Sequence, residues 1–287
     1  MVQLPPTASV GAVHVTVSDL DRSLDYYRRS IGLKLLERDD GRASLGGGSE
    51  LLVLVEEPGA RPAPRSTGLY HFALLLPERV DLARWLAHAA RERVPLLGLS
   101  DHFVSEAVYL TDPDGHGIEI YRDRPRGGWE GQVASRMTTL PLDVGDLFGE
   151  LEDPATEPFG GLPAGTRMGH VHFKVARVDE TIAFYRDVVG FDLMAALGPQ
   201  AAFFAAGGYH HHVGTNTWES AGAAPPPPGA AALRHATLVL PEESARDELL
   251  ARAGVDEPYV VDPSGNRLAV VVEPRPGQAR EAGSTSR

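Results

Sequence analysis

Two distant segments of the chain repeat one pattern. Residues 11–35 read GAVHVTVSDLDRSLDYYRRSIGLKL, and residues 169–193 read GHVHFKVARVDETIAFYRDVVGFDL. Each begins with a run that favours β structure, passes through a polar turn and enters a stretch with apolar residues at helical spacing. Gly32 and Gly190 follow that stretch, where a helix C-terminus favours a left-handed residue. Because such a unit must bury its apolar face against a neighbour, the chain is predicted to be an assembly of similar modules.

A second pattern also occurs twice. Residues 69–76 read LYHFALLL and residues 233–240 read LRHATLVL, two strands with a histidine at the same place. Each is followed by Pro-Glu, a helical stretch, and a hairpin with the turn sequence DPDG or DPSG. The predicted fold class is therefore α+β. The four βαβββ modules, numbered 1 to 4, are expected at residues 9–62, 68–124, 167–220 and 232–273.

The order of the modules predicts two domains. Residues 9–128 hold modules 1 and 2, and residues 167–274 hold modules 3 and 4. Residues 129–166 are acidic and rich in Gly and Pro, which is typical of a linker between domains. Residues 275–287 are polar and are expected to form a disordered tail.

Composition excludes several classes of protein. The formal net charge is −12, whereas nucleic-acid binding requires a basic face, so no nucleic-acid partner is expected. The chain has no cysteine, which excludes disulfides and thiolate metal sites. It starts without a signal-peptide pattern, and its apolar runs are far shorter than the roughly 20 residues that span a bilayer. We therefore expect a cytoplasmic protein with a small-molecule partner and no membrane association, with homo-oligomer formation left open.

These motifs resemble the vicinal-oxygen-chelate superfamily, which includes glyoxalases, bleomycin resistance proteins and extradiol dioxygenases. The resemblance covers residues 9–124 and 167–273. In that superfamily two βαβββ modules pair into one cupped mixed sheet around a metal, so the resemblance implies tandem domains with two such sheets. Residues 101–129, together with PAGTRMGHVHFKV and GGYHHHVGTNTW, are similar to the catechol 2,3-dioxygenase subgroup.

The resemblance implies a metal site of two histidines and one carboxylate, an arrangement that leaves coordination positions open for substrate and O₂. In that superfamily the ligands come from the first strand of each paired module and from the last strand of the second. Counting along the strands gives the first-strand positions of modules 1 to 4 as Ala12, His71, His170 and His235. The last-strand position holds Glu119 in module 2 and Ala269 in module 4. With consecutive modules paired, each half of the chain lacks one ligand.

The C-terminal half is the preferred site. His170 and His235 are expected to hold the metal, with the third ligand unknown because Ala269 occupies the carboxylate position. The resemblance implies that His212 is the acid/base toward O₂ and that Tyr259 assists the bound catecholate. No residue is expected to bind an organic cofactor. The alternative site in the N-terminal half consists of His71, Glu119 and Tyr109.

The remaining histidines are expected to have lesser roles. His14 and His172 each lie two residues beyond a ligand position, on the same face of a strand, and are expected to line the cup. His88 falls in a predicted helix, and His102 and His116 fall in loops, so these three are expected at the surface.

Module 4 is shorter than module 2. From its strand histidine to its last-strand position it spans 34 residues, against 48 in module 2. The missing part corresponds to PLLGLSDHFVSEAV. We therefore expect module 4 to lack about one strand and its loop, which trims one side of the second cup.

The resemblance predicts an enzyme of aromatic catabolism, a metal-dependent extradiol ring-cleaving dioxygenase. Fe(II) is the expected metal, with Mn(II), another divalent ion or a metal-free protein as alternatives. Two other functions stay open. The incomplete ligand sets favour a non-catalytic protein that binds a small molecule or an antibiotic. A glyoxalase-type lyase or isomerase would use a carboxylate such as Glu119 to move a proton.

Overall fold

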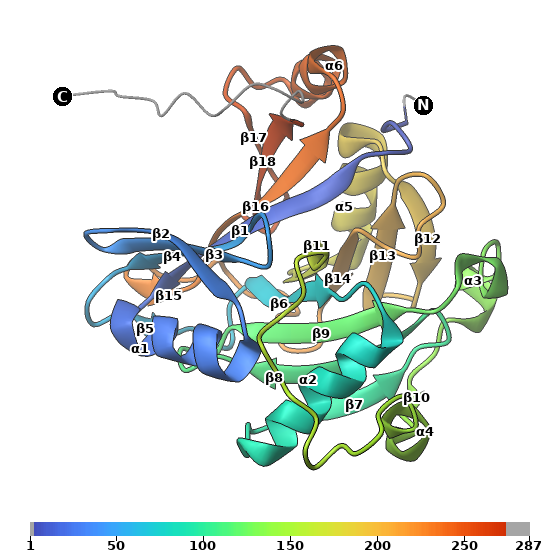
Figure 1. The fold of residues 1–287 in the computed structure, drawn as a ribbon. Coiled ribbons are helices and arrows are strands. Elements are labelled where there is room, and N and C mark those ends of the chain that lie inside the picture. Colours follow the sequence, from blue (N-terminus) through green and yellow to red (C-terminus); the bar gives the residue numbers. More distant parts are fainter. Residues whose placement is uncertain (1–2, 274–287) are drawn as a thin grey trace.

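Two mixed β-sheets dominate the fold, with helices packed against them (Figure 1). The computed structural model describes residues 3–273, so the expected tail at 275–287 lies outside the described residues. Runs of strands separated by single helices, with both parallel and antiparallel pairing in each large sheet, confirm the α+β class and the mixed sheets.

Modules 1 and 4 build a seven-stranded sheet. Its spatial order is β17 (Tyr259–Val261), β18 (Arg267–Val272), β16 (Leu233–Leu240), β1 (Ser9–Val17), β4 (Glu50–Glu56), β3 (Arg42–Gly46) and β2 (Lys34–Asp39). Module 4 contributes β16, β17 and β18, one strand fewer than module 2, so the expected shortening of module 4 is confirmed.

Modules 2 and 3, together with one short strand from the segment between them, build a nine-stranded sheet. Its spatial order is β10 (Leu140–Pro141), β7 (Gly98–Asp101), β8 (Ser105–Thr111), β9 (Gly117–Asp123), β6 (Gly68–Leu75), β11 (Arg167–Lys174), β14 (Val213–Asn216), β13 (Ala201–Ala205) and β12 (Asp192–Ala196). A small third sheet pairs two short strands, β5 (Arg61–Pro62) and β15 (Ala230–Ala231).

Each module has one main helix. These are α1 (Leu20–Tyr26), which continues into the π-helix η1 (Tyr27–Ile31); α2 (Arg79–Arg91); α5 (Val178–Ala183), which continues into the π-helix η3 (Phe184–Val189); and α6 (Glu243–Ala253). Gly32 and Gly190 end the first and third of them with φ of 91° and 97°, the left-handed conformation that the repeat predicted. Among the described residues, no helix is long and apolar enough to span a membrane.

Strand pairing joins modules that are far apart in the sequence. β1 pairs antiparallel with β16, and β6 pairs antiparallel with β11. The expectation that the two modules of each half share one sheet is therefore wrong. The alternation of side chains fixes which face of a first strand is buried, but it leaves the free edge of that strand able to pair with any other first strand.

Consecutive modules are instead connected from helix to turn. The Tyr27 hydroxyl donates to Oδ2 of Asp112 at 2.9 Å, and the Tyr185 hydroxyl donates to Oδ2 of Asp262 at 3.2 Å. These two aspartates begin the DPDG and DPSG turns. The Oδ1 atom of each accepts the backbone N–H groups two and four residues further on. The predicted turns thus also anchor module 1 to module 2 and module 3 to module 4.

The segment 129–166, expected as a linker, packs on the nine-stranded sheet. It contains the helices α3 (Val133–Arg136) and α4 (Val144–Phe148) and the strand β10, which pairs with β7; the 3₁₀-helix η2 (Arg126–Gly128) precedes it. Trp129 and Leu147 within it are buried. Its apolar residues therefore contribute to the core beside module 2.

The tyrosine-to-aspartate contacts generate a stability prediction. Tyr27→Phe should lower the free energy of unfolding by about 1–3 kcal/mol, because Oδ2 of buried Asp112 loses the one donor it has among the described residues. Tyr185→Phe should cost less, because Oδ2 of Asp262 keeps a bond from Nδ2 of Asn266. Urea unfolding measures both. Tyr26→Phe is the control, because the Tyr26 hydroxyl donates to the carbonyl of Thr111 at an exposed position. An equal loss of unfolding free energy in Tyr26→Phe and Tyr27→Phe would contradict the account.

Candidate metal centre

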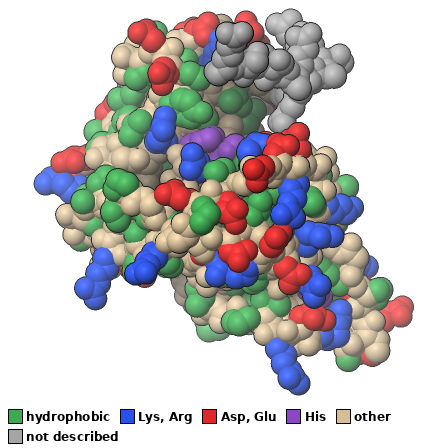
Figure 2. All heavy atoms as spheres, turned by 90° about the vertical axis from the view of Figure 1, so that its left-hand side faces the viewer, with side chains coloured by type: hydrophobic (Ala, Val, Ile, Leu, Met, Phe, Trp, Pro, Cys, Tyr) green, Lys and Arg blue, Asp and Glu red, His purple; other side chains and the backbone are tan. Residues whose placement is uncertain are grey.

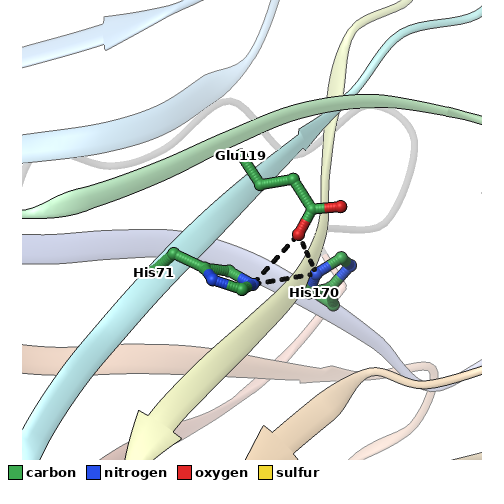
Figure 3. A group of neighbouring side chains, drawn as sticks. All are labelled: His71, Glu119 and His170. Atoms are coloured by element: carbon green, nitrogen blue, oxygen red, sulfur yellow. Dashed lines mark hydrogen bonds and ion pairs between the residues drawn. The ribbon is translucent and has the colours of Figure 1, made fainter. Parts of the chain in front are cut away.

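Two histidines and a glutamate meet at the centre of the nine-stranded sheet (Figure 3). His71 lies on β6, His170 on the neighbouring β11, and Glu119 on β9 at the other side of β6. Oε2 of Glu119 lies 3.0 Å from Nε2 of His71 and 2.9 Å from Nε2 of His170, and the two Nε2 atoms are 3.4 Å apart. All three side chains are buried. The site thus draws its donors from both halves of the chain.

The spacing of the three donor atoms fits a shared divalent ion. Ligand bonds of about 2.0–2.2 Å at tetrahedral to octahedral angles place neighbouring donors about 2.9–3.5 Å apart. The three distances fall in this range. Two imidazoles and one carboxylate with no thiolate are also the donor set of non-haem Fe(II) sites.

The protonation states suit metal binding. Burial alone would raise the pKa of Glu119, but the hydrogen bonds and the electrostatic attraction of the neighbouring His170 and His71 rings outweigh it and hold that pKa well below the ordinary value. Burial lowers the pKa of the His170 imidazole. An ionised carboxylate and a neutral imidazole are the forms that bind a metal. Nδ1 of His170 has no hydrogen-bond partner among the described residues, so the polar contacts of this ring lie at Nε2.

A fourth donor position is vacant in this sheet. Glu119 pairs with Ala73, two residues beyond His71. In module 3 the residue two positions beyond His170 is His172, and it pairs with Gly214 on β14. Gly214 therefore occupies in module 3 the position that Glu119 occupies in module 2. A Cβ at Gly214 would come within 2.8 Å of Nδ1 of His172. The sheet therefore supplies three donors, and two of them, His71 and Glu119, line the adjoining cavity.

The expected partnership of His170 and His235 is wrong. His235 lies on β16 in the seven-stranded sheet, where it pairs with His14 in the same register in which His71 pairs with His172. Ala12 lies two residues before His14, as His170 lies two residues before His172, so the two occupy equivalent positions. Ala269 and Glu119 are equivalent in the same way, because each pairs with the residue two positions beyond the strand histidine. The positions counted from the sequence are therefore equivalent in space. Because modules 2 and 3 pair, one sheet holds three donors and the other holds one.

The seven-stranded sheet carries a basic cluster in place of a metal group. The rings of His14 and His235 stack with centroids 3.9 Å apart, and Arg267 lies 4.7 Å above the ring of Tyr259. Figure 2 shows histidine side chains at the surface among Lys and Arg side chains on the side of β2 and β4. Tyr259 contacts His235 and belongs to this cluster, so it does not lie at the three-donor group.

Within the histidine run, His211 rather than His212 faces the metal group. The ring of His211 lies 4.1 Å from that of His170, and His211 lines a cavity of about 640 Å³ beside the group. His212 instead accepts a hydrogen bond from the backbone N–H of Ala206 through Nδ1. Residues 206–212 form an irregular turn in which Gly207 and Gly208 have positive φ, so strand alternation does not apply to them.

Tyr109 lies beside the metal group, as the alternative site predicted. Its ring is 5.5 Å from that of His71, and its hydroxyl is 2.8 Å from Nε2 of His102. His102 and His116, expected at the surface, instead line the cavity. Nδ1 of His102 lies 2.7 Å from the carbonyl of Thr138. Nothing in the local sequence separates a loop histidine at a cavity from one at the surface.

Residues 9–120 and 167–254 match the family model described as Glyoxalase/Bleomycin resistance protein/Dioxygenase superfamily. A catechol-2,3-dioxygenase from Bacillus subtilis (strain 168) is 40% identical to this chain over 210 residues, which cover 71% of this chain and 72% of that protein.

Two solved structures share the fold. A putative dioxygenase from Bacillus subtilis subsp. subtilis str. 168 superposes with a TM-score of 0.61 at 15% identity, covering 95% of this chain and 87% of that chain. Glyoxalase I from Zea mays superposes with a TM-score of 0.54 at 16% identity, covering 92% of each chain.

The geometry predicts which histidines hold metal. His71→Ala, His170→Ala and Glu119→Ala should each abolish stable binding of Fe(II), because two donors alone bind a divalent ion weakly. His235→Ala should leave metal content unchanged, since its ring stacks on His14 in the other sheet. Metal analysis after anaerobic reconstitution measures the content. Loss of metal in His235→Ala with retention in His71→Ala would contradict the assignment.

The basic cluster predicts an acid-dependent loss of stability. Burial lowers the pKa of His14 from an ordinary 6.5 to about 3, with help from His235 and nearby arginines, and it lowers the pKa of His235 to about 4, with help from nearby arginines. The unfolded chain therefore binds these protons first, and the free energy of unfolding should fall as the pH drops from 6.5 through about 4. Urea unfolding of a His14→Gln, His235→Gln double variant should show a shallower fall than wild type. An equal fall in unfolding free energy in the double variant and the wild type would contradict the assignment of this pH dependence to His14 and His235.

Proposed function

This chain belongs to the Glyoxalase/Bleomycin resistance protein/Dioxygenase superfamily, and on that premise we propose that it is a metal-dependent extradiol dioxygenase that cleaves a catechol ring. The observation that carries the proposal is the group of His71, Glu119 and His170, with donor atoms spaced as shared ligands beside a cavity. The relative that is 40% identical, a catechol-2,3-dioxygenase, supports the same reaction class.

His71, His170 and Glu119 would hold the ion, with Fe(II) as the expected metal. When bound, it would supply adjacent coordination positions for a catecholate and for O₂. The remaining steps fall to side chains that touch the substrate. These must position the ring and accept the protons of its hydroxyl groups.

His211 is the proposed base. The Asp123 carboxylate can only accept, so His210 donates to Oδ1 of Asp123 through Nε2, at 2.8 Å. In the neutral ring, Nδ1 of His210 is then an acceptor, and Nδ1 of His211 donates to it at 2.8 Å. Burial holds the pKa of His211 well below its ordinary value, which keeps this ring neutral. Nε2 of His211 therefore offers a lone pair to a substrate hydroxyl.

Tyr109 is the proposed positioning group for the second hydroxyl. The Thr138 carbonyl accepts from Nδ1 of His102, which makes Nε2 of His102 the acceptor for the Tyr109 hydroxyl. The phenol oxygen of Tyr109 keeps its lone pairs for a substrate hydroxyl at the metal group. Both side chains line the cavity, so the substrate would be held between Tyr109 and His211.

The proposal predicts ring cleavage that depends on His211. After anaerobic reconstitution with Fe(II), catechol and O₂ should give the yellow ring-cleavage product, with one O₂ consumed per ring. His211→Asn should lower kcat by about 10²–10⁴-fold, the usual contribution of an acid/base group, with metal content retained. Absorbance and oxygen-electrode kinetics measure both.

His212→Asn decides between the two neighbouring histidines. We expect its kcat to stay within a few-fold of wild type, because its Nδ1 bonds to the backbone of Ala206. A large loss of kcat in His212→Asn with little loss in His211→Asn would assign the acid/base role to His212, as the resemblance implied. A reconstituted protein that binds metal but cleaves no catechol would reject the dioxygenase. Turnover of the methylglyoxal–glutathione adduct would then favour a glyoxalase-type reaction, and ligand binding without turnover a binding protein.

A further inference from the structure

A buried lysine lies in the cavity at a distance from the metal group. Lys174 is on β11, four residues beyond His170 on the same face, which places it about 13 Å along the strand. It lines the same cavity as His71 and Glu119. The chain has only two lysines among its 27 basic residues, and Lys34 is the other. Lys174 is 8% exposed, whereas Lys34 is exposed.

The ammonium group of Lys174 lacks a close counter-ion. Its Nζ donates to the carbonyl of Pro64 at 3.0 Å, and no carboxylate in residues 3–273 forms an ion pair with it. Burial lowers the pKa of the lysine, and the charge of the exposed Glu219 side chain acts against that shift. An ammonium has three donors, so two remain for a ligand. Burying a cation without a partner is costly, and a bound anion would offset that cost.

Aromatic side chains line the cavity near the lysine. The rings of Tyr70, His172 and Trp218 contact one another with centroids 5.3–5.8 Å apart, and all three face the cavity. His172 sits between His170 and Lys174 on β11. A flat apolar group bound here would extend from the metal group toward the ammonium.

We propose that the substrate is a catechol with a flat apolar arm that ends in a carboxylate, and that Lys174 binds this carboxylate. The inference rests on the proposed function, because the metal group fixes the catechol end. A cavity of about 640 Å³ lies within the range of about 300–1,000 Å³ that holds drug-sized ligands, which is more than one ring requires. Lys174 supplies one positive charge, and the negative charge of Glu219 would repel a more highly charged anion, so a ligand group with a single negative charge fits this end of the cavity.

The test compares caffeate, a catechol with a propenoate arm, with its neutral primary amide. Both are titrated without O₂ into Fe(II)-loaded protein, so that no cleavage occurs, and binding is followed by the fluorescence of Trp218. Trp85 and Trp129 are buried and do not line the cavity, and a Trp218→Phe variant identifies the signal. We expect caffeate to bind about tenfold to a hundredfold more tightly than the amide, the usual size of a charge-assisted hydrogen bond.

Variants locate the preference. Lys174→Met should remove it while leaving the affinity for the amide within a few-fold, and Lys174→Arg should keep most of it. Lys34→Met is the matched control, because it removes the other lysine on exposed β2, and it should keep the full preference. Glu219→Gln should increase the preference, since it removes the opposing charge.

Equal affinities of wild-type protein for caffeate and its amide would overturn the inference. So would a Lys174→Met variant that loses both ligands equally, because that pattern indicates a structural role through Pro64. Cleavage of unsubstituted catechol is measured separately. If catechol is cleaved and the charge preference is absent, the inference fails and the dioxygenase stands. If the preference is present and no catechol is cleaved, the dioxygenase fails and Lys174 remains an anion-binding residue.

Discussion

The antiparallel pairing of β6 with β11 is the contact on which the candidate site depends. It joins the first strand of module 2 to the first strand of module 3 and so brings His71 and His170 to one point. Glu119 reaches the same point because β9 pairs parallel with β6. Two donors thus come from the N-terminal half and one from the C-terminal half. A metal at this point would link the halves, and neither half could hold it alone.

Much of this could be predicted from the sequence. The repeats indicated the fold class, the module order and the shortened module 4, and the resemblance to the superfamily implied the strand positions of His71, His170, His235 and Glu119. Neither indicated which first strand pairs with which, because the alternation of side chains specifies the buried face of a strand but not the strand that pairs along its edge. That one choice changed two incomplete ligand sets into a complete one. His211 escaped prediction for a different reason, since strand alternation fails in the glycine turn before β14.

The two sheets show what the repeat retained and what it lost. The seven-stranded sheet keeps the register of the other, with His14 opposite His235, but has Ala12 and Ala269 where the nine-stranded sheet has His170 and Glu119. Modules 1 and 4 are joined in that sheet by the pairing of β1 with β16, and Tyr27 and Tyr185 link them to modules 2 and 3 through buried aspartates. Of the two related sheets, the nine-stranded one therefore holds the three-donor group.

Anomalous diffraction at the iron edge, from crystals of protein reconstituted with Fe(II), tests the central claim most directly. The account predicts one strong peak per chain, about 2.0–2.2 Å from Nε2 of His71, Nε2 of His170 and Oε2 of Glu119. A peak beside His235, or no peak at these three atoms in protein that retains iron, would contradict it.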